Sequence, residues 1–314
     1  MPNLDIIIVN WNSGVHLLRC LASMLLASRE GFELARVVVV DNASSDGSAE
    51  RLDFLDLPLQ LIRNSFNRGF AAACNQGVQG SEADYLLFLN PDTILLENSL
   101  EAPIAFLARS ENTSIGICGI QLADEAGRVS RTCARFPTPG HLLARCLGLD
   151  RLLPQVFPNH FLSEREHHES RVVDQIMGAF FLVRRAVFDL LGGFDERFFV
   201  YYEDLDFSFR ARRGGWSSYF LSAALAVHSG GGCSKHVKAA RLFYSLRSRI
   251  LYAYKHFPSA NATAVLLATL LFEPFARLGR AMIRGSVAEI IETGQAYWWF
   301  WKATPRLLVK GREA

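Results

Sequence analysis

The feature that most constrains the fold is the stretch YLLFLNPD at residues 85–92, an apolar run that closes in a loop carrying a carboxylate. Five apolar residues in succession are typical of a strand buried on both faces, as in a mainly parallel sheet covered by helices. Pro91 cannot donate to a sheet ladder, so we expect the strand to end at about Asn90. Asp92 would then lie just beyond the carboxyl end of the strand, where open α/β sheets bind ligands.

Asn90 and Asp92 allow two interpretations. A carboxylate beside an amide at this position can hold a divalent cation against a diphosphate. Residues 90–93 could instead form only a turn with an N-cap for the helix that follows. The four residues by themselves leave both interpretations open.

The first third of the chain alternates between strand-like and helix-like segments. We predict strands at residues 4–9, 36–40, 59–63 and 85–89, with helices at 15–27 and 67–78. This alternation indicates βαβ units with right-handed crossovers, and therefore an α/β fold. Polar side chains end three of the strands, namely Asn10 with Asn12, Asp41, and Asp92. Parallel strands share one carboxyl edge, so we expect these side chains to converge.

The middle of the chain is less regular. We predict a strand pair at residues 115–122 and 129–132, a long loop at 136–171, a strand at 173–184 with Gly178 near its centre, and a short helix at 186–191. A helix is expected at 203–213, with acidic residues in its first turn and arginines in its last, as the helix dipole favours. A strand at 219–228 should then end in His228.

The character of the chain changes near residue 235, so we predict a domain at 1–235 and a helical C-terminal region at 236–314. Helical patterns cover 237–254 and 262–279, and Glu273-Pro274 interrupts the apolar part of the second. An aromatic cluster at 297–301 is flanked by Lys302 and Arg306. Aromatic rings beside cations suit the headgroup layer of an anionic membrane. The alternative is a helical appendage that packs on the rest of the chain or on a second subunit, as in a homodimer.

Composition excludes several classes of protein. The 314 residues are 50% hydrophobic, with a formal net charge of +2, which lacks the basic excess of a nucleic-acid binder. The six cysteines are scattered without metal-ligand spacing, and we expect free thiols in a reducing cytosol. We expect no signal peptide and no membrane-spanning segment. The expected location is therefore cytoplasmic, peripheral on the inner face of the plasma membrane.

The order of motifs resembles glycosyltransferase family 2 proteins of the GT-A fold, and most closely their bacterial rhamnosyltransferase-like branch. The matching stretches are IIIVNWNSG (6–14), VVVVDNASSDGS (37–48), NRGFAAACNQG (67–77), LFLNPDT (87–93), residues 177–216 and AVHSGGGCS (226–234). The resemblance covers the first 230 residues or so, and the C-terminal region lies outside it. It implies a Rossmann-like nucleotide-sugar-binding sheet flanked by helices, followed by a C-terminal helical appendage.

The resemblance implies roles for several residues of a donor pocket. Asp41 would accept a hydrogen bond from the N3–H of a uracil or thymine base. The alternative is that its side chain only forms an Asx-turn with the local backbone. Asn10 and Asn12 would line the same pocket. Asn67 and Arg68 stand where an amide and a cation could reach ribose or phosphate, or where a surface helix could simply begin.

A metal site is implied in the same way. Residues 90–92 occupy the place of the family's DXD motif, with an amide, Asn90, in place of the first carboxylate. Asp92 would be the charged ligand and His228 the second ligand, binding Mn²⁺ or Mg²⁺. The alternative for His228 is a structural histidine at a strand end. Neutralising the departing nucleoside diphosphate is the expected electrostatic task, and Arg241 or Lys235 could assist.

The pair Glu203-Asp204 supplies the candidate general base. A sugar hydroxyl must lose its proton while it attacks the anomeric carbon, and a positioned carboxylate can take that proton. In the resembled family the aspartate of this pair is the base, so we assign Asp204, with Glu203 orienting it or touching the acceptor. The alternative is that both carboxylates only cap and solvate the start of a helix.

We therefore predict an inverting glycosyltransferase that uses a dTDP- or UDP-sugar, with dTDP-β-L-rhamnose first. The acceptor would be a hydroxyl of a polyprenyl-diphosphate-linked or polysaccharide glycan of the bacterial cell surface. Three alternatives remain: another UDP- or dTDP-hexose as donor, a catalytically inactive member that binds glycan in an assembly, and a nucleotidylyltransferase. The last would need a glycine-rich basic loop after the first strand, and a nicotinamide enzyme would need GxGxxG there, whereas residues 10–14 are rich in amides.

Overall fold

The structure is a computed structural model that describes residues 1–50, 52, 55–230 and 237–310, apart from the side chains of 165, 306 and 308–310. Two compact units divide the chain. Unit 1 comprises Met1–Arg135, Phe161–Glu196 and Glu203–Cys233, and unit 2 comprises Phe136–His160, Arg197–Tyr202 and Ser234–Ala314. Unit 2 resumes at residue 234, next to the predicted domain boundary. Its two shorter segments, Phe136–His160 and Arg197–Tyr202, were not predicted from the sequence.

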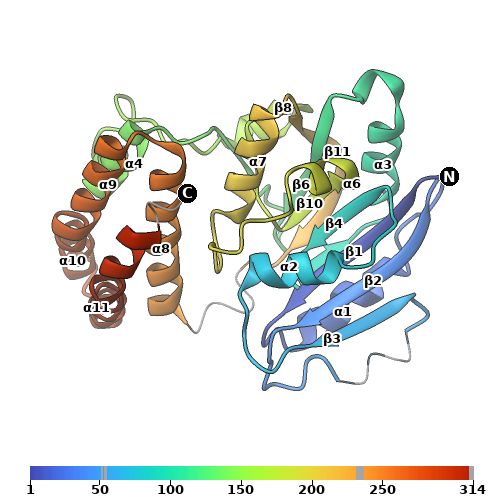
Figure 1. Cartoon of the computed structure of the whole chain (residues 1–314), viewed down its shortest axis with the longest axis horizontal. Helices are drawn as coiled ribbons and strands as arrows, with labels where there is room; N and C mark the ends of the chain where they lie inside the picture. Colours follow the sequence, from blue (N-terminus) through green and yellow to red (C-terminus); the bar gives the residue numbers. More distant parts are fainter. Residues whose placement is uncertain (51, 53–54, 231–236, 311–314) are drawn as a thin grey trace. The chain divides into compact units, whose positions relative to one another are not determined.

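A nine-stranded mixed sheet forms the centre of unit 1 within the described residues, in the order β3-β2-β1-β4-β10-β6-β11-β5, with β8 pairing with β11 (Figure 1). Strands β1, β2, β3, β4, β6 and β11 run in one direction, and β5, β8 and β10 run against them. The strands are β1 Asn3–Asn10, β2 Glu33–Asp41, β3 Leu59–Arg63, β4 Tyr85–Leu89, β5 Thr93–Leu95, β6 Ile115–Ala123, β8 Arg171–Val173, β10 Phe180–Arg184 and β11 Ser217–His228. The mainly parallel α/β sheet that the sequence predicts is therefore confirmed.

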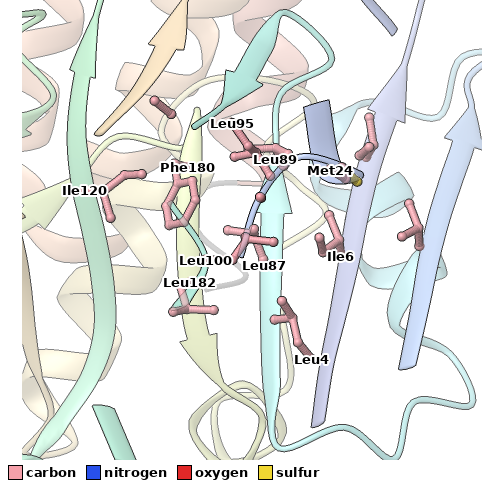
Figure 2. Close-up of a cluster of buried hydrophobic side chains, with 14 of the residues drawn as sticks. Leu4, Ile6, Met24, Leu87, Leu89, Leu95, Leu100, Ile120, Phe180 and Leu182 are labelled. Atoms are coloured by element: carbon pink, nitrogen blue, oxygen red, sulfur yellow. The ribbon is translucent and has the colours of Figure 1, made fainter. Parts of the chain in front are cut away.

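Helices cover both faces of this sheet. They are α1 Val15–Met24, α2 Phe70–Val78, α3 Glu101–Ala108, α6 Arg185–Leu190 and α7 Glu203–Arg213. Alternate residues of β1 point to opposite faces. Ile6 and Ile8 share a buried cluster with α1 and α3, whereas Ile7 and Val9 share one with α2, α6 and α7. Figure 2 shows the first cluster, in which side chains of β1, β4, β10 and β6 project from neighbouring strands.

Three local predictions differ from the structure. The predicted strand at 173–184 is divided into β9 (Gln175–Ile176) and β10, and Gly178 lies between them. The predicted loop at 136–171 contains helices α4 (Pro139–Cys146) and α5 (Leu149–Leu152) and the 3₁₀ turn Glu164–His167. Of the predicted pair at 115–122 and 129–132, only a single bridge joins Val129 to Ala123, while β7 (Cys133–Ala134) pairs with β9.

Unit 2 is helical, with α4, α5, α8 (Lys238–His256), α9 (Ser259–Leu271), α10 (Glu273–Ile283) and α11 (Val287–Lys310). The predicted helix at 262–279 is thus two helices that meet at Phe272. Glu273 is only 2% exposed, and it is paired with Arg249 and with Arg277 at 2.7 Å. The carboxylate is neutralised inside the unit, which offsets the desolvation of a buried charge.

One segment of unit 2, Ser259–Ile283, is long and apolar enough to cross a membrane by length and composition, with a mean hydropathy of 1.4 over its best window. In the structure this segment comprises α9 and α10, and 39% of that window is buried. We had expected no such segment, because Glu273-Pro274 interrupts the apolar run.

The cysteines that the structure describes are free and buried, as expected: Cys20, Cys74, Cys118, Cys133 and Cys146. Burial raises the pKa of the Cys20, Cys74 and Cys118 thiols far above the usual value. These thiols therefore stay protonated and pack as small apolar groups. Cys233 and Lys235 lie outside the described residues.

Candidate active site

The first group of polar side chains lies where β1 and β2 end. The two strands are parallel, and their register places Asn10 opposite Asp41. Both side chains are buried, and Asn10 Nδ2 donates to Asp41 Oδ1 at 2.8 Å. The same amide nitrogen lies 2.9 Å from Ser48 Oγ and 3.0 Å from Ser44 Oγ, while Asn10 Oδ1 accepts from Ser13 Oγ. The predicted convergence of Asn10 and Asp41 is therefore present.

Two loops close over this group and hold each other. Asn12 adopts φ 51°, a left-handed conformation that asparagine tolerates. Its Oδ1 accepts from the backbone N–H of Ser45 at 2.8 Å, and Asp46 Oδ2 accepts from the N–H of Gly14 at 2.7 Å. A cavity of about 90 Å³ opens beside this loop, lined by Asp41, Ser44, Ser45, Gly47, Ala49, Glu50 and Arg63. The site therefore offers carboxylate, hydroxyl and backbone groups to a polar ligand.

Asn42 was not singled out by the sequence, yet it connects β2 to the loop before α2. Its Nδ2 donates to the carbonyl of Gly69 at 3.0 Å, and its Oδ1 accepts from Asn64 Nδ2 at 3.0 Å. Asn67 uses its side chain locally, because Oδ1 accepts from the N–H of Gly69 at 2.9 Å. The side chain of Arg68 is exposed. The donor-binding roles of Asn67 and Arg68 stay predictions.

The second group comprises Asp92 and His228. β4 ends at Leu89, and the N–H of Asn90 donates to the carbonyl of Ala179 at 3.1 Å. Thr93 then lies opposite His228 where β5 and β11 pair. Asp92 Oδ1 is 3.1 Å from His228 Nε2, and Asp92 is 6% exposed. The predicted pairing of these two residues is therefore present in the fold.

The geometry of this pair is compatible with a shared cation. Within the described part of the chain, His228 Nε2 is buried and makes no hydrogen bond of acceptable geometry, although Asp92 Oδ1 lies 3.1 Å away. Two oxygen or nitrogen ligands of one small divalent cation, each at about 2.1 Å, lie about 3 Å apart when they occupy neighbouring positions. No group of three or more histidine, cysteine or acidic side chains converges in this way among the described residues. The ligand roles of Asp92 and His228 stay predictions.

The third group lies at the start of α7. Tyr201 and Tyr202, which precede the helix, adopt φ 68° and 71°, a conformation that is strained for large side chains. Asp204 Oδ2 accepts from the N–H of Gly178 at 2.9 Å, and its Oδ1 accepts from the N–H of Leu205 at 2.7 Å. Burial raises the pKa of Asp204, whereas these N–H groups and the side chain of Gln175 lower it in part.

Glu203 has a different environment. It is 7% exposed, and its Oε2 has no hydrogen-bond partner among the described residues. Burial raises the pKa of Glu203 well above its usual value, and the charges of Asp204 and Asp206 raise it further. The two adjacent carboxyl groups thus differ, because the N–H groups of Gly178 and Leu205 hold Asp204, whereas Oε2 of Glu203 has no partner among the described residues. A protonated Glu203 beside an ionised Asp204 is the distribution that this geometry favours.

The register of the sheet brings the three groups to one edge. β1 and β4 are parallel, with Ile8 opposite Leu89, so Asn10 and Asn90 end neighbouring strands. β10 runs against β4, with Phe180 opposite Leu89, so Gly178 and its contact with Asp204 lie at that same edge. β9 is held there partly by close packing of Ile176 against Gly119, where a β-carbon would clash with the Ile176 side chain.

Comparisons with known proteins agree with this arrangement. The family model described as "Glycosyl transferase family 2" matches residues 5–192. An "N-acetylglucosaminyl-diphospho-decaprenol L-rhamnosyltransferase" of Mycobacterium tuberculosis is 29% identical over 72% of this chain and 75% of its own length. "Rhamnosyltransferase WbbL" of Escherichia coli is 28% identical over 47% of this chain and 53% of its own length.

Solved structures share the fold. A "mannosyltransferase PcManGT from Pyrobaculum calidifontis in complex with GDP-Man and Mn2+" aligns with a TM-score of 0.56 at 17% identity, covering 99% of this chain and 86% of that one. "GalNAc-T7 with UDP, GalNAc and Mn2+" aligns with a TM-score of 0.54 at 16% identity, covering 91% of this chain and 58% of that one. The GT-A fold expected from the motifs is confirmed.

Proposed function

The chain belongs to glycosyl transferase family 2 and is a glycosyltransferase, and on this premise we propose that it transfers L-rhamnose from dTDP-β-L-rhamnose. The acceptor is a hydroxyl of a glycan linked to a polyprenyl diphosphate, in the synthesis of a bacterial cell-surface polysaccharide. Two relatives support the choice of sugar and of acceptor by their names, an N-acetylglucosaminyl-diphospho-decaprenol L-rhamnosyltransferase and the rhamnosyltransferase WbbL.

The observation that carries this proposal is the convergence of three polar groups at one edge of the sheet. Asp41 Oδ1 accepts from Asn10, and Oδ2 makes only a long contact of 3.4 Å with the N–H of Ser44, so Oδ2 can accept from the N3–H of a pyrimidine base. Ser44 and Ser45 line the small cavity beside it and offer groups to the rest of the nucleoside. A uracil or thymine ring presents one N–H between two carbonyls, so a buried carboxylate is a suitable partner.

Asp92 and His228 are the residues that would hold the divalent metal, Mn²⁺ or Mg²⁺. Their two ligand atoms lie 3.1 Å apart without a hydrogen bond between them, which fits a shared cation. When bound, the metal would neutralise charge on the diphosphate of the donor. One carboxylate and one imidazole give a weaker site than two carboxylates, and the mixed donor set favours Mn²⁺ over Mg²⁺.

Asp204 is the proposed general base. The N–H groups of Gly178 and Leu205 fix its carboxylate and keep it ionised more readily than its neighbour. An ionised carboxylate in this position takes the proton of the acceptor hydroxyl as the hydroxyl attacks the anomeric carbon. A single displacement inverts that carbon, so a β-L-rhamnosyl donor gives an α-L-rhamnoside.

Unit 2 provides the proposed contact with a membrane surface. α11 presents Val287, Ile291, Trp298 and Trp301 at spacings of one helix face, and each is at least half exposed. Phe275 and Ile283 of α10 are 73% and 89% exposed. Lys302 Nζ lies 4.4 Å from the ring centre of Trp298. Of the predicted aromatic cluster, Tyr297 and Phe300 are buried instead, so only part of it is available to lipid.

A thermal-shift panel tests the proposed function. We expect dTDP or UDP, but neither GDP nor CMP, to raise the melting temperature, and the rise to require Mn²⁺. A ligand at about 100 times its Kd stabilises the native state by about 2.7 kcal/mol, which such a panel detects. Asp41→Ala should abolish the shift, and Arg109→Gln, which changes an exposed cation, should leave it intact. No shift with any nucleotide would instead support an inactive, glycan-binding member of the family.

A further inference from the structure

A second cavity, of about 300 Å³, lies in unit 2 against the first half of α8. It is lined by Tyr201, Lys238, Arg241, Leu242 and Ser245. The four residues from α8 are spaced as neighbours on a single helix face. The volume lies at the lower end of the range for small-molecule sites, which begins at about 300 Å³.

The polar groups that line this cavity are an ammonium, a guanidinium and two hydroxyls, without a carboxylate. Arg241 has no acidic partner among the residues that the structure describes, and Lys238 Nζ is 3.8 Å from Glu292 Oε1 in a half-exposed pair. Such a pair contributes little, so both positive charges remain available to a ligand. A guanidinium fork beside an ammonium and hydroxyls matches the oxygens of a phosphate or diphosphate.

The remaining wall is apolar. Leu242 and Tyr201 line the cavity beside the cationic groups. The hydrocarbon part of a ligand can therefore pack against them next to its anionic group. α8 begins at Lys238, and the positive end of its dipole adds to the attraction for an anion there. A ligand that combines a diphosphate with a short stretch of hydrocarbon meets both parts of this lining.

We propose that this cavity binds the diphosphate and the first prenyl carbons of a lipid-linked acceptor. The inference rests on the proposed function in taking the acceptor to be linked to a polyprenyl diphosphate. All residues that line the cavity belong to unit 2, whereas the residues proposed for the donor, Asp41, Asp92 and His228, belong to unit 1. In this proposal Arg241, which the sequence suggested as a helper for the departing diphosphate, contacts the acceptor instead.

Isothermal titration of the full-length protein with geranyl diphosphate, a soluble probe with the same head and first carbons, tests this assignment. Losing one charge-assisted hydrogen bond corresponds to about tenfold in Kd or more, so Arg241→Gln and Lys238→Gln should each weaken binding by at least that factor. Glu292→Gln should tighten binding, because it removes the carboxylate that competes for Lys238. Arg109→Gln is the matched control and should change nothing.

The outcomes separate this inference from the proposed function. Unchanged binding in Arg241→Gln and Lys238→Gln, with normal melting curves, overturns the assignment. So does an equal loss of dTDP or UDP affinity in these variants, since the cavity would then serve the donor. Inorganic diphosphate binding as tightly as geranyl diphosphate would show that no lipid part is recognised. If Arg241-dependent binding of geranyl diphosphate is found while no nucleotide binds, the proposed function fails and this site stands.

Discussion

Replacing Glu203 by glutamine should stabilise the protein in a pH-dependent manner. Glu203 is 7% exposed, its Oε2 lacks a hydrogen-bond partner among the described residues, and two carboxylates lie beside it. Burial and those charges raise its pKa well above the usual 4.5. Glutamine has the shape of the protonated glutamate side chain and carries no charge. The variant therefore keeps the stability that the wild type loses when Glu203 ionises.

The sign follows from proton linkage. Because the folded pKa is raised, the native state keeps the proton of Glu203 after the unfolded chain has released it. Its contribution to stability is complete below the usual value of 4.5 and is lost as pH rises through the folded pKa. Between these two pKa values, the free energy of unfolding of the wild type falls by about 1.4 kcal/mol per pH unit relative to that of the variant. We therefore expect nearly equal stability near pH 4.5, and a variant whose advantage grows as the pH rises and then levels off above the folded pKa of Glu203.

Urea unfolding of both proteins at several pH values between about pH 4.5 and 8 measures this difference directly, provided that the urea dependence, m, is unchanged. Asp204→Asn is the matched control, because Asp204 accepts hydrogen bonds from Gly178 and Leu205 that asparagine only partly replaces. This control should gain less stability at high pH than Glu203→Gln, because backbone donors offset part of the rise in the pKa of Asp204. Parallel curves for the wild type and Glu203→Gln across the whole range would refute the reasoning.

Three further predictions concern activity and membrane binding. Asp204→Asn should lower the rate of sugar transfer by about 10²- to 10⁴-fold while donor affinity stays within a few-fold; loss of donor binding in titrations would mean that the role is wrong. Asp92→Asn and His228→Gln should each weaken the Mn²⁺-dependent part of nucleotide binding and spare any metal-independent part, and equal binding with and without Mn²⁺ in the wild type would contradict this. Phe275→Ser with Ile283→Ser should reduce sedimentation with phosphatidylglycerol vesicles at least tenfold, since burying each side chain contributes about 1.5–3 kcal/mol; unchanged sedimentation would argue against this face.

Much of the central sheet could be predicted because continuous apolar runs can be recognised locally. The predicted strands at 59–63 and 85–89 have the same bounds as β3 and β4. The division of 173–184 could not be predicted, because the chain leaves the sheet where Gly178 meets Asp204, a contact between distant residues. The helix within 136–171 did have a signal. Thr138 caps α4 by accepting from the N–H of His141 at 3.2 Å, and Pro139 follows it.

In the candidate site, too, some features could be predicted from the sequence and others depend on contacts that the sequence does not reveal. The pairs Asn10–Asp41 and Asp92–His228 could be anticipated because parallel strands bring their carboxyl ends to one edge. Asn42 and Gln175 act by fixing backbone or another side chain, and an amide next to a motif carries no signal of that. Trp298 and Trp301 are separated from Tyr297 and Phe300 by helical periodicity, which a cluster of five aromatic residues in sequence conceals.

The contact between Gly119 and Ile176 limits how this enzyme can vary. Gly119 lies inside β6, where glycine is ordinarily a weak choice. A methyl group there would push Ile176 outward, and Gly178, whose N–H holds the proposed base, stands two residues further on. We therefore expect Gly119→Ala to shift the carboxylate of Asp204 through Ile176 and Gly178, without direct contact between residues 119 and 204. A position in the middle of the sheet is thus expected to affect the proposed base, and a mutant library restricted to residues around the substrate would miss it.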